Sequence, residues 1–237
     1  MHKSDLQEQL VALYLRLNGY FVSGFIIHAP EREVNKRGEP RRNRTELDAL
    51  AIRFPYNAEP EREIGPSKYL QVSHTHTDIL ICEVKGGEQS LGFNEGLRND
   101  PRAVASMLRW IGLFDEKKLE TLTEPVMALL STQFPNDKDT FREYIVPDTD
   151  VRIRAMFFAP DREAPVDQRQ SRYIYGNELL TYIWSCLRPP ELRSECQTRY
   201  DFSLWGTYEN IVRYFKEKAG QNPGTMQELY QAMQVEE

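Results

Sequence analysis

Two short apolar runs of this chain carry charged side chains at positions that a β-strand would bury. Residues 45–52 read TELDALAI and residues 78–87 read DILICEVKGG, so Asp48, Glu83 and Lys85 fall among Leu, Ile and Val. An unpaired charge inside a strand costs on the order of several kcal/mol. A fold that accepts these runs must compensate the charges with one another or with a cation. A hard divalent metal ion compensates two carboxylates most simply.

Composition and charge restrict the class of protein. The chain has 237 residues, 40% of them hydrophobic, which is enough for a sizeable core. Its net charge of −6 argues against a protein that coats nucleic acid through bulk positive charge. Three scattered cysteines without a CxxC pair favour neither a disulfide framework nor a zinc knuckle. Since no apolar run reaches about 18 residues and no signal peptide is recognisable, we expect a soluble cytoplasmic protein with no membrane partner.

Hydrophobic periodicity predicts an α/β fold that begins with a helix and three strands. The second strand is expected to place Asp48 on the same face as Leu50, and the third to end with Glu83 and Lys85 side by side. The third strand is interpreted either as one element or as two joined near His74. The expected core elements are a helix over residues 4–18, strands over 20–28, 46–54 and 69–85, a helix over 103–114 and a strand over 126–130.

Beyond residue 135 the pattern is less informative. It predicts a strand over residues 151–158, a helix that runs from Gly176 to Leu187, and a further apolar helical stripe from Trp205 to Phe215. Stripes of this kind are usually core or subunit contacts. No recognisable motif accompanies them, so the sequence assigns these elements no chemical role.

The order of the core elements and their charged residues resemble the PD-(D/E)XK nuclease superfamily, which includes restriction endonucleases and Holliday-junction resolvases. Its members carry an Asp on the second strand and a Glu-x-Lys or Asp-x-Lys motif on the third, which Asp48 and Glu83-Val84-Lys85 match. Glu8 is similar to a Glu on the first helix of resolvase-like members. The conjunction carries the resemblance, because Glu-x-Lys alone arises by chance in most proteins of this size.

This resemblance covers residues 4–132 and implies an organisation for the whole chain. It predicts a restriction endonuclease-like αβββαβ core, in which a central mixed sheet is flanked by helices, within residues 1–135. Residues 136–237 would form a C-terminal extension, a strand and helices, packed on the same domain. The fourth core strand would then be the apolar run at residues 126–130.

The resemblance also implies an activity, a metal-dependent deoxyribonuclease that hydrolyses phosphodiester bonds. Asp48 and Glu83, helped by the carbonyl of Val84, would hold one or two Mg²⁺ ions, for which Mn²⁺ is expected to substitute. Lys85 would orient the attacking water or stabilise developing charge, and Glu8 would reach a metal or its water shell. A DNA endonuclease in bacterial defence, restriction or repair is the expected role, with RNA as the alternative substrate.

Partners follow from the same expectation. Cutting both strands of a duplex normally requires two active sites, so a homodimer is predicted. The chain carries no Gly-rich phosphate loop and no helicase motif. An ATPase or methyltransferase that works with this protein would therefore be a separate chain.

A basic stretch precedes the second strand and is a candidate nucleic-acid contact. Residues 32–44 are rich in Arg and Lys and could hold phosphate backbone beside the site. A solvated hairpin loop explains the segment equally well, because Glu31, Glu33 and Glu39 offset half of its charge. The candidate phosphate ligands are Arg37, Arg41, Arg42 and Arg44.

Other functions and other ligands remain open. The same scaffold could bind nucleic acid or a protein partner without cutting, or the chain could be an α/β interaction subunit that is no nuclease. Glu46 is either a supporting ligand or a solvated strand end. His74, His76 and Asp78 have a spacing that could bind zinc, although a solvated hairpin tip accounts for them as well.

Overall fold

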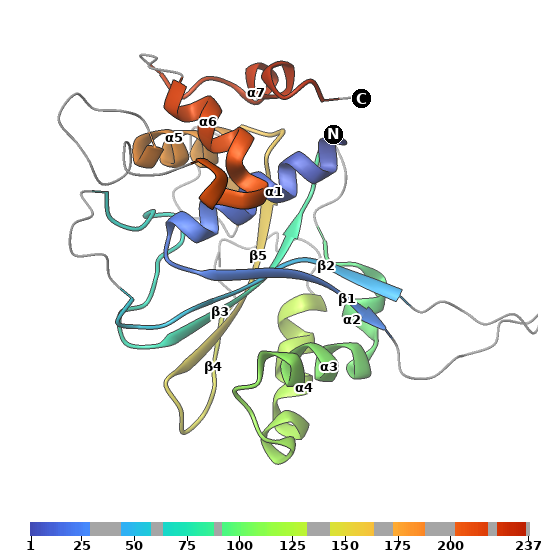
Figure 1. Cartoon of the computed structure of the whole chain (residues 1–237). Coiled ribbons are helices and arrows are strands. Elements are labelled where there is room, and N and C mark those ends of the chain that lie inside the picture. Colours follow the sequence, from blue (N-terminus) through green and yellow to red (C-terminus); the bar gives the residue numbers. More distant parts are fainter. Residues whose placement is uncertain are drawn as a thin grey trace, which may run out of the picture.

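The described residues form a mixed six-stranded sheet with helices on both faces (Figure 1). The computed structural model describes residues 1–28, 44–57, 64–87, 92–131, 143–163, 173–187, 202–217 and 222–235. The strands are β1 (Phe21–His28), β2 (Arg44–Arg53), β3 (Thr77–Val84), β4 (Glu143–Ile145), β5 (Val151–Ala159) and β6 (Tyr173–Tyr175). The helices are α1 (Lys3–Leu17), α2 (Glu95–Asn99), α3 (Pro101–Ile111), α4 (Glu116–Ser131), α5 (Gly176–Leu187), α6 (Glu209–Glu217), α7 (Met226–Ala232) and the 3-10 helix η1 (Phe202–Tyr208).

The sheet combines antiparallel and parallel strand pairs. Its strand order is β1-β2-β3-β5-β4, with β6 also pairing with β5. The pairs β1–β2, β2–β3 and β4–β5 are antiparallel, whereas β5 pairs in parallel with β3 and with β6. The predicted α/β class is confirmed. Segments from both sides of residue 135 contribute strands to this one sheet.

Two apolar clusters, one on each face, hold the helices to the sheet. On β3, Leu80 and Cys82 belong to the cluster that includes α1, α5, α6 and α7, while Ile79 and Ile81 belong to the cluster that includes α2, α3 and α4. This alternation arises because successive side chains of a strand point to opposite faces. Figure 1 shows the same division, with α1 and α5–α7 on one side and α2–α4 on the other.

Helix α1 follows its predicted range closely. It begins at Lys3 rather than at Ser4, and its N-cap His2 makes no side-chain capping hydrogen bond. At the other end Gly19 adopts a φ of 83°, and its N–H donates to the carbonyl of Arg16 at 2.9 Å. Tyr20 donates to the carbonyl of Leu15 at 3.1 Å, which completes a Schellman cap. The chain therefore leaves α1 directly into β1.

The predicted strand at residues 126–130 is wrong, because this segment lies inside helix α4. Leu119, Leu122, Val126 and Leu129 are all buried, and their spacing places them on one face of a helix. A run of five apolar residues cannot by itself distinguish a buried strand from part of an amphipathic helix. The strand that pairs with β3 is instead β5, which the sequence predicted at residues 151–158.

Only the second half of the predicted strand over residues 69–85 forms a strand. Arginine side chains take up the backbone carbonyls of the first half: Arg154 donates to Leu70 at 2.7 Å, and Arg152 donates to Gln71 at 2.9 Å. Gln71 also has a φ of 44°, which a strand does not allow. β3 therefore begins only at Thr77.

A buried charge network stands at the start of β3. The carboxylate of Asp78 accepts from Tyr20 Oη at 2.6 Å, from Arg152 Nη2 at 2.9 Å and from Arg154 Nε at 3.0 Å. Burial alone would raise the pKa of Asp78, but the two guanidinium groups outweigh it and hold that pKa below its usual range. His76 Nδ1 lies 2.9 Å from Thr75 Oγ1. Asp78 is therefore paired with Arg152 and Arg154, so it does not supply the carboxylate that the zinc alternative requires.

Candidate active site

Strands β2 and β3 separate at the point where the charged residues lie. Their last paired residues are Ala49 and Cys82, although β2 continues beside β1 to Arg44 and β3 continues beside β5 to Val84. Figure 1 shows the two strand ends diverging. The N–H of Val84, which faces β2, donates to Asp48 Oδ2 at 2.7 Å instead of to a backbone carbonyl. We call this opening the β2/β3 fork.

A β-bulge places Asp48 at the fork. Ser23 pairs with Leu50 and Phe25 with Leu47, so Gly24 alone stands opposite Asp48 and its neighbour. The bulge interrupts the two-residue alternation of β2, because Leu47 and Leu50, three residues apart, join the same core cluster. The regular alternation of a strand therefore breaks between Leu47 and Leu50, although it holds from Ala49 to Ile52. A Cβ at Gly24 would lie 2.9 Å from the carbonyl oxygen of Asp48, so the close approach requires glycine.

Glu83 is a buried carboxylate with little compensation. Its side chain has no solvent exposure and forms an ion pair with the ammonium of Lys85, which is 18% exposed. Apart from this contact, neither Oε1 nor Oε2 of Glu83 accepts a hydrogen bond of regular geometry from any donor in the described part of the chain. Burial, followed by the charge of Asp48, raises the pKa of Glu83 to about 7, against the opposing effect of Lys85.

The pKa values of the neighbouring carboxylates are raised as well. Burial raises the pKa of Asp48, although the N–H of Val84 and the charge of Lys85 lower it. Glu8 is an exposed residue of α1, and its pKa is raised to about 7 by partial burial and then by the charge of Asp48. Three carboxylates from three elements therefore repel one another at one place, with Lys85 as their nearby cation.

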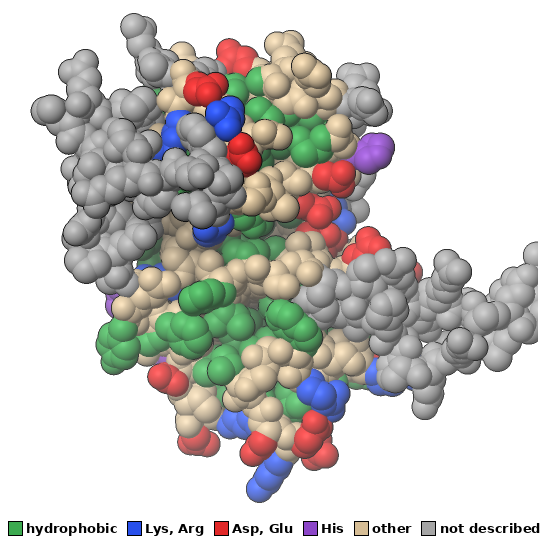
Figure 2. All heavy atoms as spheres, in the orientation of Figure 1, with side chains coloured by type: hydrophobic (Ala, Val, Ile, Leu, Met, Phe, Trp, Pro, Cys, Tyr) green, Lys and Arg blue, Asp and Glu red, His purple; other side chains and the backbone are tan. Residues whose placement is uncertain are grey.

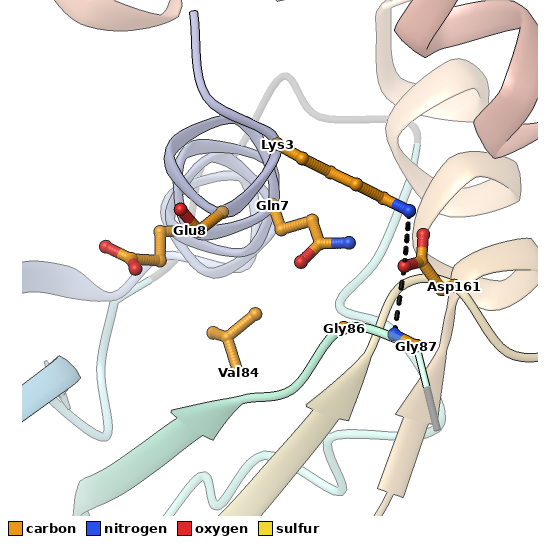
Figure 3. Close-up of a pocket in the computed structure, with 8 residues that line it drawn as sticks. Lys3, Gln7, Glu8, Val84, Gly86, Gly87 and Asp161 are labelled. Atoms are coloured by element: carbon orange, nitrogen blue, oxygen red, sulfur yellow. Dashed lines mark hydrogen bonds and ion pairs between the residues drawn. The ribbon is translucent and has the colours of Figure 1, made fainter. Parts of the chain in front are cut away.

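The surface beside this group is acidic and hollowed. Figure 2 shows acidic side chains gathered beside α1. An open pocket of about 430 Å³ lies between α1 and the end of β3. In Figure 3, Glu8 and Gln7 extend to opposite sides of α1, above Val84. The pocket is lined by Lys3, Ser4, Gln7, Glu8, Val84, Gly86, Gly87 and Asp161.

The donor set suits a divalent ion that keeps much of its own water. Among the described residues, no group of three or more His, Cys, Asp or Glu side chains is arranged to hold a metal ion. Asp48 and Glu83 offer two carboxylates, and among the described residues the oxygens of Glu83 accept no regular hydrogen bond apart from the contact with Lys85. Mg²⁺ is usually bound through one or two carboxylates and several waters, so this pair fits it. Glu8 would act from outside that pair.

The structure brings the four predicted catalytic residues together. Asp48, Glu83 and Lys85 meet at the fork, and Glu8 is coupled to them through its charge. The predicted phosphate ligands Arg37, Arg41 and Arg42 lie outside the described residues. Arg44 begins β2, but its side chain is also outside the described part.

The sequence reasoning missed the residues on the far side of the pocket. Lys3 and Gln7 stand four residues apart on α1, a spacing that puts them on one face and could have pointed to them. Asp161 follows β5 without any local motif, and Tyr230, which contacts both Gln7 and Asp161, lies in α7. Only the fold brings these residues to the candidate site.

In comparisons with known proteins, no family model, no curated protein and no solved structure matches this chain. In the part of the chain that the structure describes, no helix combines the length and the apolar character needed to cross a bilayer.

Proposed function

We propose that the protein is a metal-dependent nuclease that hydrolyses phosphodiester bonds at the β2/β3 fork. One observation carries the proposal: Glu83 is fully buried, it pairs with Lys85 and with no other donor in the described part of the chain, and it stands beside a second carboxylate, Asp48. A buried carboxylate pair of this kind destabilises the fold unless a cation is bound. Lys85 supplies only one positive charge to the pair.

The proposal gives each residue a distinct role. Asp48 and Glu83 would hold Mg²⁺, with Mn²⁺ as a substitute and the carbonyl of Val84 as a further oxygen. The bound ion would supply Lewis acidity, lowering the pKa of a coordinated water and neutralising charge on the phosphate. Lys85 would orient the attacking water or stabilise the developing charge from its position beside Glu83. Glu8 would accept a hydrogen bond from the water shell.

A restriction endonuclease-like core of the PD-(D/E)XK type belongs to the proposal. The supporting features are the leading helix α1, the antiparallel strands β1, β2 and β3, the helical layer α2–α4 and the strand β5 parallel to β3. Asp48 lies on the second strand, and Glu83 and Lys85 lie at the end of the third, in agreement with the expected motif.

The substrate and the partners are proposed on general grounds. DNA is favoured, with RNA as the alternative, in a bacterial defence, restriction or repair setting. A homodimer would supply two active sites for the two strands of a duplex. In the described sheet β1 is an edge strand, and the exposed ring of Phe21 at its start lies 6.0 Å from the exposed ring of Phe54, which supports pairing between copies. Any ATPase or methyltransferase partner would be a separate chain.

Cleavage assays test the proposal directly. Wild type, Lys85→Ala and the control Lys117→Ala, at an exposed residue of α4, are incubated with supercoiled plasmid, linear duplex, single-stranded DNA and RNA. Each reaction contains Mg²⁺, Mn²⁺ or EDTA. We expect metal-dependent cleavage by wild type and Lys117→Ala, and a loss of at least about 100-fold in Lys85→Ala. No cleavage of any substrate by folded wild type would favour a scaffold that binds without cutting.

A further inference from the structure

Asp161 gathers hydrogen-bond donors from three separate segments of the chain. Lys3 Nζ of α1 lies 3.0 Å from Asp161 Oδ2, and the N–H of Gly87, just after β3, donates to the same oxygen at 3.0 Å. The hydroxyl of Tyr230 in α7 donates to Asp161 Oδ1. Figure 3 shows Asp161 between Lys3 and Gly87. A single carboxylate thus joins the first helix, the exit of β3 and the last described helix.

A second set of contacts reinforces this arrangement. Gln7 Nε2 donates to Tyr230 Oη at 2.7 Å, and the ammonium of Lys3 lies 4.9 Å from the centre of the Tyr230 ring. Arg162 Nε donates to the carbonyl of Gly87 at 2.9 Å. Two consecutive residues, Asp161 and Arg162, therefore hold both polar groups of Gly87.

The surroundings of Asp161 favour its ionised form. Burial alone would raise its pKa, but hydrogen bonds from Tyr230, Lys3 and the N–H of Gly87 outweigh burial and hold the pKa of Asp161 below its usual range. The carboxylate is therefore ionised at neutral pH. Hydrogen bonds to an ionised acceptor are roughly twice as strong as those between neutral groups.

The arrangement fixes the two elements that supply the candidate site. Gly86 and Gly87 directly follow Glu83-Val84-Lys85 in the chain, and Lys3 and Gln7 precede Glu8 on α1. A Cβ at Gly86 would lie 2.7 Å from Gln7 Oε1, so the turn after β3 passes close against α1. Movement of this turn would move Lys85.

We propose that Asp161 is a positioning residue that locks the Gly86–Gly87 turn against the first turns of α1, with Tyr230 holding Asp161 in place. This lock keeps Lys85 beside Glu83 at the fork. The structural part of the inference stands on the contacts alone, and its catalytic part rests on the proposed nuclease function. It makes α7 a structural support of the candidate active site.

Amide hydrogen exchange tests the lock without reference to activity. Asp161→Ala and Tyr230→Phe are compared with Asp100→Ala, which removes the N-cap of α3, and with Tyr182→Phe, whose hydroxyl contacts Leu17 and Gly65. We expect amides of residues 85–87 to exchange about tenfold faster in Asp161→Ala and less than tenfold faster in Tyr230→Phe, with no change in either control. If Asp161→Ala fails to fold, Tyr230→Phe decides. Unchanged exchange at residues 85–87 would overturn the lock.

The catalytic part has its own readout, the Mg²⁺ concentration that gives half of the maximal cleavage rate. Displacement of Lys85 and Glu83 should raise this Mg²⁺ concentration several-fold in Asp161→Ala. A simple loss of folded protein would instead lower the maximal rate and leave the Mg²⁺ concentration at half of that rate unchanged. Faster exchange with an unshifted Mg²⁺ midpoint would overturn the positioning role. If wild type cleaves no nucleic acid, the proposed function fails, while the exchange measurement still decides whether Asp161 locks the turn.

Discussion

At the scale of single residues, the candidate site is defined by carboxylates that the fold holds close together. Glu83 and Glu8 both have a pKa raised to about 7, and the pKa of Asp48 is raised as well. Ordinary surface carboxylates repel one another weakly because water screens them. Here burial removes that screening from Glu83. The repulsion between these carboxylates therefore destabilises the fold, and binding of a cation would offset this destabilisation.

The raised pKa of Glu83 determines the direction in which stability changes with pH in metal-free buffer. Folding shifts the pKa from 4.5 to about 7, so the folded state binds the proton more tightly than the unfolded state between these two values. The free energy of unfolding contributed by this group should therefore fall as pH rises from about 4.5 to about 7. Glu83→Gln removes this loss, so we expect the variant to gain stability over wild type across that range, by about 2 kcal/mol at pH 8.

Urea denaturation at pH 5 and pH 8, in EDTA, measures this difference. Glu120→Gln, at an exposed carboxylate of α4, serves as the control and should follow wild type at both values. A Glu83→Gln variant that is less stable than wild type at pH 8 would show that the carboxylate is better compensated than its contacts indicate.

The residues of the site differ in how far the sequence could reveal them. Asp48, Glu83 and Lys85 are visible because charged side chains interrupt apolar strands, a pattern that needs an explanation in any fold. Asp161 and Tyr230 carry no such mark. Their importance comes from contacts with residues 74 and 223 positions away, to Gly87 and Gln7, and no local pattern encodes contacts of that range.

At the scale of elements, the bulge in the β1–β2 pair determines where Asp48 lies. Gly24 opposes two residues of β2 and touches the carbonyl of Asp48. Bulges often lie next to functional sites, where they redirect a side chain. A sequence pattern of period two cannot anticipate a bulge, so the break in alternation between Leu47 and Leu50 was not predicted.

Gly24→Ala tests the bulge. The added Cβ would lie 2.9 Å from the carbonyl oxygen of Asp48, so the backbone must shift. We expect the free energy of unfolding to fall by about 1–3 kcal/mol and Mn²⁺ affinity to fall with it, because Asp48 moves from the fork. Gly65→Ala is the matched control, since a Cβ there meets nothing within 4 Å. Equal behaviour of the two variants in urea denaturation and Mn²⁺ titration would contradict the role given to the bulge.

Helix α4 shows a second limit of sequence patterns. Its buried residues have helical spacing, yet Pro125 lies inside the helix, and the apolar run after this proline was interpreted as a strand. Proline disfavours a helix interior locally, but packing against the sheet overrides that preference here. The strand beside β3 was instead β5, whose charged residues Arg152 and Arg154 are compensated by Asp78.

At the scale of the whole molecule, the two ends of β3 have different tasks. Asp78, near its start, joins the arginines of β5 and Tyr20 in a buried network, whereas Glu83, near its end, faces the fork. The first set of charges is satisfied internally, whereas at the second end Lys85 faces carboxylates that repel one another. A stable frame at one end thus supports an electrostatically strained site at the other.

Arg154→Met tests whether the two ends of β3 are energetically independent. It leaves Asp78 buried with Arg152 and Tyr20 alone, so we expect the free energy of unfolding to fall by about 3 kcal/mol. Mn²⁺ affinity of the folded fraction should not change, because the fork lies at the other end of the strand. Arg109→Met, which breaks an exposed ion pair with Glu116, should match wild type in urea denaturation. A large shift in Mn²⁺ affinity in Arg154→Met would contradict the independence of the two ends.

The most direct test of the central claim is the binding of Mn²⁺ to wild type, Asp48→Asn and Glu83→Gln by isothermal titration calorimetry at pH 8. The account predicts that wild type binds the ion and that each substitution weakens binding at least about tenfold, since each removes one of two anionic ligands. Equal binding by the wild type and both variants, or no binding by folded wild type, would contradict a metal site at the β2/β3 fork.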